Sequence, residues 1–191
     1  NQSVVGISVI DAPHFLANYQ LALEAYELSS GAFEPTILPL TDYWGFGSGE
    51  ERIKAGVDTA EVLRRLSMVG MEKISLEADS FLRKLTPSVQ LDLGGSAKGY
   101  GADLVAQILQ DRFGLQNVLV EIGGEMFALG RKSAESTWTV GINLPEEAAA
   151  VNQIAELMSL ENKGVATSGN YRNFYKVDGA TYSHTLNPKT G

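Results

Sequence analysis

The chain has 191 residues, enough for one large domain or two small ones, and it is 44% hydrophobic and 20% charged. A net charge of −8 without a run of basic residues excludes a general nucleic-acid binder, and no apolar stretch is long enough to span a membrane. The absence of cysteine excludes disulfides, thiolate metal sites and a cysteine nucleophile. We expect a single domain over residues 1–191, truncated at both ends, because the chain begins inside a strand pattern and stops on a turn signal.

Alternating hydrophobicity predicts a first strand over Val4–Ile10. Apolar residues at three-to-four spacing predict a helix over Phe15–Ser29, with Gly31 as its C-terminal stop. The segment GAFEPTILPLTDYWGFGSGE follows, and its prolines and glycines argue against regular structure. Its aromatic residues are too many for an ordinary solvent-exposed loop.

Asp58 and Glu61 are spaced as in a capping box, so a helix should begin there and end near Gly70. Three short strands are expected next, over Lys73–Leu76, Phe81–Leu85 and Val89–Leu93. A helix that follows a cluster of glycines should end at Gly114 and place five residues on one face: Tyr100, Leu104, Val105, Ile108 and Leu109.

The second half of the chain is dominated by strand patterns. NVLVEIGGEMFALGR predicts a strand, a glycine turn and a strand, and further strands are expected in STWTVGINLP and over Ile154–Leu160. The Asp178-Gly179 pair predicts the turn of a hairpin within GVATSGNYRNFYKVDGATYSHTLNP. Strands in meandering groups with few helices between them indicate an α+β fold of mixed and antiparallel sheets with packed helices.

The stretch DLGGSAKGYGAD places a lysine and four glycines where a helix begins. Free backbone N–H groups and the positive end of the helix dipole make such a start a suitable anion site. The spacing matches neither a P-loop nor a dinucleotide-binding turn. The alternative is a tight strand-to-helix connection in which Gly99 and Gly101 allow close packing. Residue types alone leave both open, and Lys98 favours the anion site.

Three other motifs each allow a structural and a functional interpretation. Glu125 in IGGE is either a solvated turn carboxylate or an acceptor for ligand donors, and ATSGNYR is either a Ser/Thr turn or a set of donors to a nucleotide. His14, just before a helix, is expected at the surface or in a cap. A lone histidine such as His184 is more often structural, yet its ordinary pKa suits acid–base work near neutrality. The sequence contains no Gly-x-Ser-x-Gly elbow, so a serine hydrolase has no support.

Six segments in order resemble the ApbE-type FAD:protein FMN transferases, historically labelled thiamine-biosynthesis lipoproteins: FEPTILPLTDYWGFG, LDLGGSAKGYGAD, VEIGGEMFALG, WTVGI, ATSGNYRNFY and YSHTLNPKTG. The resemblance implies an α+β fold with an FAD cleft between its sub-parts, FAD as substrate and Mg2+ as cofactor. It also implies transfer of FMN to a threonine hydroxyl of an acceptor protein with release of AMP. The alternatives are an FAD pyrophosphatase giving FMN and AMP, and a non-catalytic flavin-binding protein.

The same resemblance implies roles for individual residues. Phe33 and Glu34 would border the flavin-side pocket, although Glu34 stands where the family commonly has aspartate. Leu186 would pack against the isoalloxazine ring, and His184 would orient or deprotonate the threonine hydroxyl. The resemblance places Ser96, Lys98 and Tyr100 near the pyrophosphate and the ribityl chain, and it places Glu125 and Ser168 on the other walls of the pocket.

The backbone carbonyl of Ala97 would be one ligand of the cation, and Asp92 would support the glycine turn. The remaining metal ligands, an acidic residue and a threonine, are expected downstream of Gly191. The resemblance further implies an acceptor that is a flavoprotein subunit of a membrane redox complex. It places the protein in the periplasm or at the outer face of the cell envelope, with a lipid anchor upstream of this chain.

Overall fold

The computed structural model describes residues 3, 5–47, 56–146, 150, 153–171 and 173–191. The chain forms two compact units, a first comprising Asn1–Gly95 and Asn173–Gly191 and a second comprising Ser96–Arg172. Both combine helices with small antiparallel sheets, which confirms the α+β class. That residues 1–191 form one domain stays a prediction. Among the helices of the described ranges, none has the length and hydrophobicity needed to cross a membrane.

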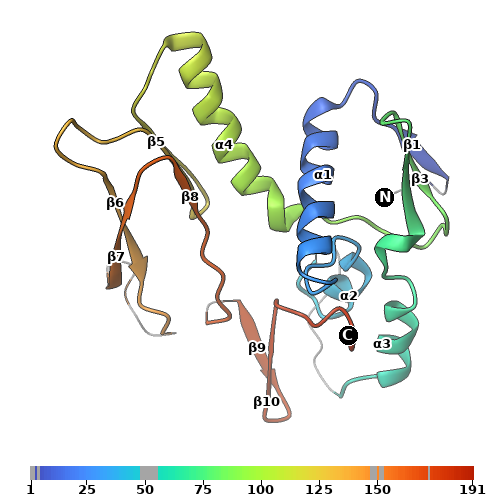
Figure 1. Cartoon of the computed structure of the whole chain (residues 1–191). Helices are drawn as coiled ribbons and strands as arrows, with labels where there is room; N and C mark the ends of the chain where they lie inside the picture. The colour runs from blue at the N-terminus through green and yellow to red at the C-terminus, as the bar shows by residue number, and fades with distance from the viewer. Residues whose placement is uncertain (1–2, 4, 48–55, 147–149, 151–152, 172) are drawn as a thin grey trace. The chain divides into compact units, whose positions relative to one another are not determined.

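In the first unit, one helix covers a three-stranded antiparallel sheet (Figure 1). The helix is α1 (Pro13–Leu28), and the sheet order is β1 (Gly6–Ser8), β3 (Phe81–Lys84), β2 (Ile74–Glu77). Alternate strand residues face the helix, because side chains of a strand point to opposite sides. The buried residues of this core are Val9, Tyr19, Met71, Ile74, Leu82 and Val89.

The termini of α1 follow from local sequence. Pro13 occupies the first turn, where its missing N–H costs nothing and its fixed φ suits the helix. The helix stops as predicted, because Gly31 adopts a φ of +76° and its N–H donates to Tyr26 O at 2.9 Å. The strand predicted over Val4–Ile10 is shorter than expected, and Val4 lies outside the described residues.

The predicted strand over Val89–Leu93 is wrong. Val89 is fully buried, but this segment runs as irregular backbone, and Asp92 N–H donates to Pro35 O at 2.6 Å. The N–H of Asp92 donates to the carbonyl of a loop residue and not to a neighbouring strand, so this segment is not part of a β-sheet. An apolar run predicts burial reliably, whereas its pairing depends on which backbone lies beside it.

A second core of the first unit joins two short helices to a hairpin far along the chain. The elements are α2 (Leu38–Tyr43), α3 (Thr59–Leu66), β9 (Phe174–Val177) and β10 (Ala180–Ser183). The buried residues of this second core are Leu40, Trp44, Val62 and Val69, with Tyr182 and Leu186 packed against them. The 3-10 turn η1 (Met71–Lys73), which follows α3 along the chain, contributes Met71 to the first core.

The prolines of the aromatic-rich segment 31–50 argued against regular structure, yet this segment contains the helix α2. The helix forms because Pro39 lies in its first turn, where proline is tolerated. Residues 48–50 of that segment lie outside the described ones.

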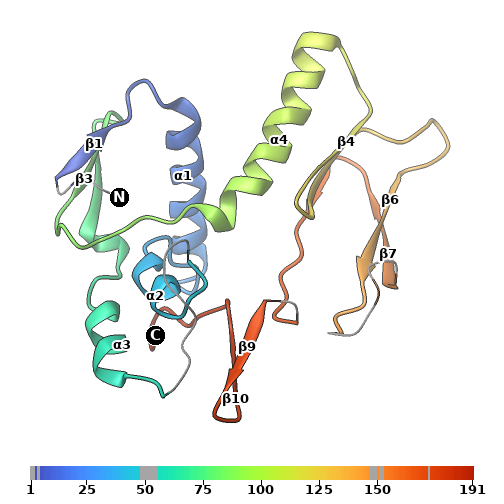
Figure 2. The same ribbon diagram turned by 180° about the vertical axis from the view of Figure 1, so that it is seen from behind.

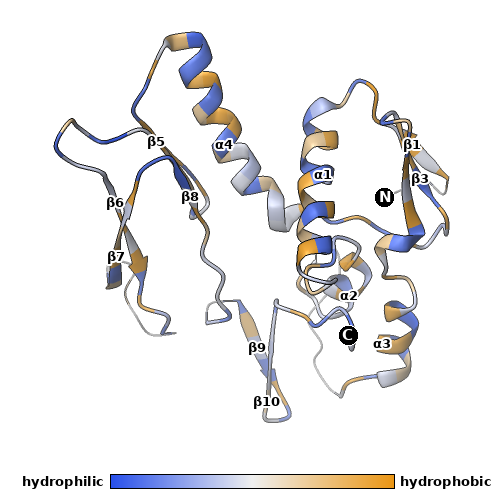
Figure 3. Cartoon of the chain, viewed as in Figure 1, coloured by the Kyte–Doolittle hydropathy of each residue, from blue (hydrophilic) through white to orange (hydrophobic). Residues whose placement is uncertain are grey.

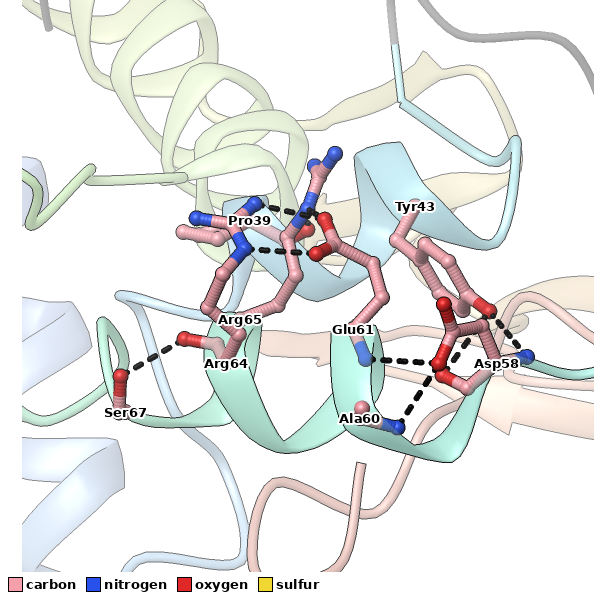
Figure 4. Close-up of polar contacts among 8 residues, drawn as sticks. All are labelled: Pro39, Tyr43, Asp58, Ala60, Glu61, Arg64, Arg65 and Ser67. Atoms are coloured by element: carbon pink, nitrogen blue, oxygen red, sulfur yellow. Dashed lines mark hydrogen bonds and ion pairs between the residues drawn. The ribbon is translucent and has the colours of Figure 1, made fainter.

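The capping prediction at α3 is half right. The Asp58 carboxylate accepts from Ala60 N at 2.9 Å and Glu61 N at 3.2 Å, as an N-cap should (Figure 4). The reciprocal bond of a capping box is replaced, since Asp58 N–H donates to Tyr43 Oη at 3.0 Å. The helix ends at Leu66, short of the predicted Gly70.

The second unit has three layers, a helix on one face of a sheet and a two-stranded ribbon on the other (Figure 2). The helix is α4, the sheet has the order β4-β5-β8, and the ribbon is β6-β7. Their bounds are α4 (Gly94–Phe113), β4 (Val118–Ile122), β5 (Glu125–Leu129), β6 (Trp138–Asn143), β7 (Ile154–Leu160) and β8 (Lys163–Val165). These strands confirm the predicted ones, and β8 takes the beginning of the expected hairpin segment.

The buried face of α4 differs from the predicted one. Ala102 and Ala106 are 1% exposed and pack on Val120, whereas Val105 and Ile108 are 39% and 37% exposed. Of the predicted face, Leu109 packs against this cluster. Small residues face the sheet because the helix lies close to it, and larger apolar residues alternate with polar ones elsewhere (Figure 3).

Both hairpin turns predicted from glycine are confirmed. Gly123 and Gly124 have φ of +58° and +97°, and Asp178 and Gly179 have φ of +50° and +81°. Two consecutive residues in the left-handed region match the twist of the flanking strands, which selects glycine and aspartate there.

Candidate functional site

The residues predicted to form the site fall into two sets, one in each unit. The first unit holds Phe33, Glu34, His184 and Leu186, and the second unit holds Ser96, Ala97, Lys98, Tyr100, Glu125 and Ser168. Within the second set, the structure brings Lys98 and Glu125 into direct contact.

The predicted anion site differs from expectation in its helix geometry. The helix begins at Gly94, not after the glycines, so Lys98 lies in the second turn of α4. Asp92 accepts from Gly94 N at 2.8 Å and thereby satisfies one of the N–H groups that a helix start leaves unpaired. This bond agrees with the supporting role expected for Asp92.

Lys98 and Glu125, predicted from separate motifs, form an ion pair. Lys98 Nζ lies 2.7 Å from Glu125 Oε2 and 3.4 Å from the carbonyl of Gly123. The lysine side chain is 48% exposed and the glutamate 19% exposed, so the ammonium is open to solvent while the carboxylate is largely covered. The pair ties the second turn of α4 to the β4–β5 turn.

The glycines of this stretch divide between the two interpretations. A Cβ on Gly101 would lie 3.2 Å from Ile122 Cδ1, so Gly101 allows the close packing of helix and sheet. A Cβ on Gly99 would meet nothing within 4 Å, so packing gives no reason for that glycine. The packing interpretation is therefore confirmed for Gly101 only.

Ser168 lies at the wall of a cavity of about 700 Å³ within the second unit. Its apolar lining includes Met126, Val140 and Met158, and its polar lining includes Thr167 beside Ser168. A cavity of this size with apolar walls and a few polar groups has the character of a small-molecule site.

Glu34 is directed into the protein. It is 9% exposed, and its Oε1 accepts from Thr36 N at 2.9 Å and Thr36 Oγ1 at 2.7 Å. Gly70 N–H donates to Thr36 Oγ1 at 2.6 Å, which links this loop to the residues after α3. One oxygen of Glu34 is thus committed to shaping the backbone before α2. The neighbouring Phe33 ring lies where a Cβ on Gly95 would come within 2.7 Å of it, so this contact needs glycine at that position.

His184 follows β10 and is held at one edge of its ring. Its backbone N–H donates to Asn173 O at 3.3 Å, and its Nδ1 lies 3.2 Å from the same carbonyl oxygen. A carbonyl can only accept, so Nδ1 carries the hydrogen in this contact. In the neutral ring the lone pair then belongs to Nε2, which is the geometry of a proton acceptor.

An aromatic cluster beside His184 was not predicted as part of a site. The Phe46 ring lies edge-on to the imidazole, with centroids 6.4 Å apart and planes at 67°. Phe46 packs on Tyr175 at 5.4 Å, and Tyr175 stacks on Tyr182 at 5.6 Å. The feature of the sequence that could have indicated this cluster is the run YWGF, which has three aromatic residues among four. Leu186 packs against the second core of this unit, whose buried residues include Leu40 and Trp44.

The described residues do not make up a cation site. Ala97 lies inside α4, where a backbone carbonyl ordinarily accepts from the N–H four residues later. Within the described ranges, no three histidine, aspartate or glutamate side chains are grouped so that they could hold a metal ion.

Comparison with known proteins gives one consistent result at the level of sequence. The model of the ApbE family matches residues 2–191. Curated relatives named "FAD:protein FMN transferase" include one from Haemophilus influenzae, 34% identical over 89% of this chain, and one from Vibrio cholerae, 36% identical over 89%. The chain spans about half the length of these relatives, 49% of each.

Solved structures agree. The flavin transferase ApbE from Vibrio cholerae matches 100% of this chain and 58% of its own, with a TM-score of 0.82 and 32% identity. The ApbE protein from Thermotoga maritima matches 97% of this chain and 58% of its own, with a TM-score of 0.81 and 30% identity. On a family match over nearly the whole sequence, and on relatives that share both fold and sequence, this chain belongs to the ApbE family.

Proposed function

We propose that the protein to which this chain belongs is an FAD:protein FMN transferase. It moves FMN from FAD to a threonine hydroxyl of an acceptor protein and releases AMP. The observation that carries the proposal is the name shared by the relatives from Haemophilus influenzae and Vibrio cholerae, at 34% and 36% identity. Because the chain spans about half of their length, the activity is proposed for the full-length protein.

In this reaction the threonine oxygen forms a bond to the phosphorus of the FMN half, and the bond from that phosphorus to the oxygen bridging to AMP breaks. We assign His184 as the group that takes the hydroxyl proton at Nε2. The contact from Nδ1 to the Asn173 carbonyl supports this assignment, because it leaves the Nε2 lone pair available. The bridging electron pair leaves with AMP.

Lys98 is proposed to bind the diphosphate of FAD. Phosphoryl transfer depends mainly on positioning the reacting groups and on stabilising the negative charge of the phosphate oxygens. An ammonium group can stabilise that charge. The 48% exposure of the side chain supports this, since the ammonium can be reached while it is paired with Glu125. The cavity beside Ser168 is proposed to take an apolar ring system of the same substrate, supported by its volume of about 700 Å³.

Three further properties are proposed for the full-length protein. Mg2+ dependence is proposed with the Ala97 carbonyl as one ligand and the others downstream of Gly191. The acceptor is proposed to be a flavoprotein subunit of a membrane redox complex. Location in the periplasm or at the outer envelope face, with a lipid anchor, stays a prediction.

The test is transfer by the full-length protein. FAD, Mg2+ and an acceptor carrying a threonine target are incubated, and covalent flavin is read by fluorescence of the acceptor band in a denaturing gel, with and without EDTA. The proposal expects a fluorescent band that EDTA abolishes. Release of FMN and AMP at equal rates with and without acceptor would identify a pyrophosphatase instead, and FAD binding without turnover would identify a binding protein.

A further inference from the structure

We infer that Phe46 is a positioning residue for His184, an inference that rests on the proposed function for its kinetic consequence. The hydrogen bond from Nδ1 to Asn173 O fixes only one edge of the imidazole. Rotation about the terminal side-chain torsion of histidine is broad, so one bond leaves the ring plane free to tilt or flip. The Phe46 ring, 6.4 Å away at 67°, limits that rotation from the side.

Phe46 can do this because its own position is fixed by its backbone. After α2 ends, Phe46 N–H donates to Thr41 O at 2.9 Å, and the flanking Gly45 adopts a φ of +69°. A Cβ on Gly47 would lie 1.7 Å from Asp42 Oδ1, so any larger residue there would require the Asp42 side chain to move. The backbone at Phe46 is thus held in place, and the orientation of its ring is set by the residues it packs against.

The Phe46 ring also packs against the hairpin that leads to His184. Tyr175 lies 5.4 Å from Phe46, and its hydroxyl donates to Trp44 O at 3.0 Å, two residues before Phe46. Tyr182 stacks between Tyr175 and Trp44 at 5.6 Å and 5.0 Å. The loop after α2 and the β9–β10 hairpin are therefore joined by one aromatic cluster, with His184 at its end.

This arrangement goes beyond packing in one respect. A cluster that served stability alone would need no fixed orientation of the histidine ring. Here the bond to Asn173 selects the proton on Nδ1, and the Phe46 contact keeps the ring in the plane where that bond forms. Loss of the ring at position 46 should therefore change the tautomer of His184 as well as the rate.

The experiment uses full-length protein labelled with 15N in histidine, in three variants. Phe46→Leu removes the ring and keeps an apolar side chain, Phe46→Tyr keeps the ring, and Phe81→Leu removes a half-buried phenylalanine on β3 of the same unit. The resonances of His184 are those lost in His184→Gln. Two-bond and three-bond proton–nitrogen spectra then report which ring nitrogen carries the hydrogen, and steady-state transfer reports kcat and the KM for FAD.

We expect the neutral wild-type ring to be protonated at Nδ1. Phe46→Leu should show both tautomers, with kcat lowered about tenfold or more and KM for FAD within about twofold, because misplacing a reacting group costs rate rather than substrate affinity. Phe46→Tyr should restore kcat to within about threefold, and Phe81→Leu should leave tautomer and kcat unchanged. A Phe46→Leu protein with the wild-type tautomer overturns the inference. If wild-type protein transfers no FMN, the proposed function fails, and the tautomer measurement still decides the inference.

Discussion

The two candidate regions hold their functional side chains by different means. In the second unit, Lys98 is held by the charge of Glu125 at 2.7 Å and faces solvent. In the first unit, His184 is held by the neutral carbonyl of Asn173 and by the Phe46 ring. An ammonium that must meet an anion can exchange one anionic partner for another. A base must keep one nitrogen deprotonated, so a neutral acceptor and a fixed ring serve it better.

This contrast predicts that changes around His184 affect rate, and that changes at Lys98 affect substrate affinity. It also predicts that the scaffold beneath each region contributes stability without chemistry.

Replacing the base should have the largest effect. His184→Ala should lower kcat for FMN transfer by about a hundredfold or more, the usual contribution of a general base, with FAD affinity nearly unchanged. Transfer is measured by flavin fluorescence on the acceptor and affinity by quenching of FAD fluorescence. His14→Ala is the matched control, because His14 is the other histidine of the chain. Equal transfer by His184→Ala and wild type would leave His184 as a structural residue.

The core beneath the aromatic cluster should come next. Leu40 is 0% exposed in the core of α2, α3 and the hairpin, so Leu40→Ala should lower the free energy of unfolding by about 2–5 kcal/mol. Urea denaturation followed by tryptophan fluorescence checks this, since Trp44 belongs to the same core. Leu63→Ala on the exposed side of α3, 58% exposed, should cost far less. Equal losses for both variants would contradict the assigned core.

The lysine should affect binding. Lys98→Ala removes a charge-assisted contact to phosphate, so FAD affinity should fall by about 1.5–3 kcal/mol, roughly tenfold to a hundredfold. Titration of FAD into the full-length protein measures the change. Lys132→Ala removes an exposed lysine of the same unit and should leave affinity unchanged. Unaltered affinity in Lys98→Ala would limit the glycine–lysine stretch to helix packing.

The contrast between the regions also explains what the sequence could predict. Asp178-Gly179, Gly123-Gly124 and the Asp58 cap were predictable because each depends on residues within a few positions. A helix after the glycine–lysine stretch was predictable for the same reason, although α4 begins at Gly94, earlier than expected, and the anion site itself stays a prediction. The pairing of Lys98 with Glu125 was not predictable, since that contact depends on how the β4–β5 turn meets α4.

The surroundings of His184 depend on long-range contacts. Tyr175 donates to Trp44 across 131 positions of the chain, and no local pattern encodes that meeting. The same holds for Val89–Leu93, whose hydrophobicity predicted burial but not its partner, and for α4, whose alanine face was selected by the closeness of the sheet. Tertiary packing thus decided the features that local propensity left open.

A cap under the aromatic cluster should have a smaller effect. Asp58→Ala removes the acceptor for Ala60 N and Glu61 N and should cost about 1 kcal/mol of unfolding free energy. Asp58→Asn keeps an oxygen in the same place and should cost little, because asparagine caps about as well as aspartate. Thermal unfolding of the two variants measures the difference. If both variants lose the same free energy of unfolding, the negative charge of Asp58, and not its role as a hydrogen-bond acceptor at the N-cap, stabilises α3.

The smallest effect concerns the ion pairs that fasten α3. Hydrogen bonds from Arg64 and then Arg65 lower the pKa of Glu61 from 4.5 to about 2, and Arg65 also donates to Pro39 O at the start of α2 (Figure 4). A lowered folded-state pKa stabilises the fold fully above about pH 4.5, and this contribution is lost as the pH falls towards 2. The difference in unfolding free energy between wild type and Glu61→Gln should therefore be constant near neutrality and shrink below pH 4.5. Urea denaturation at successive pH values measures it. A difference that does not change with pH would show that the pairs with Arg64 and Arg65 leave the ionisation of Glu61 unaffected.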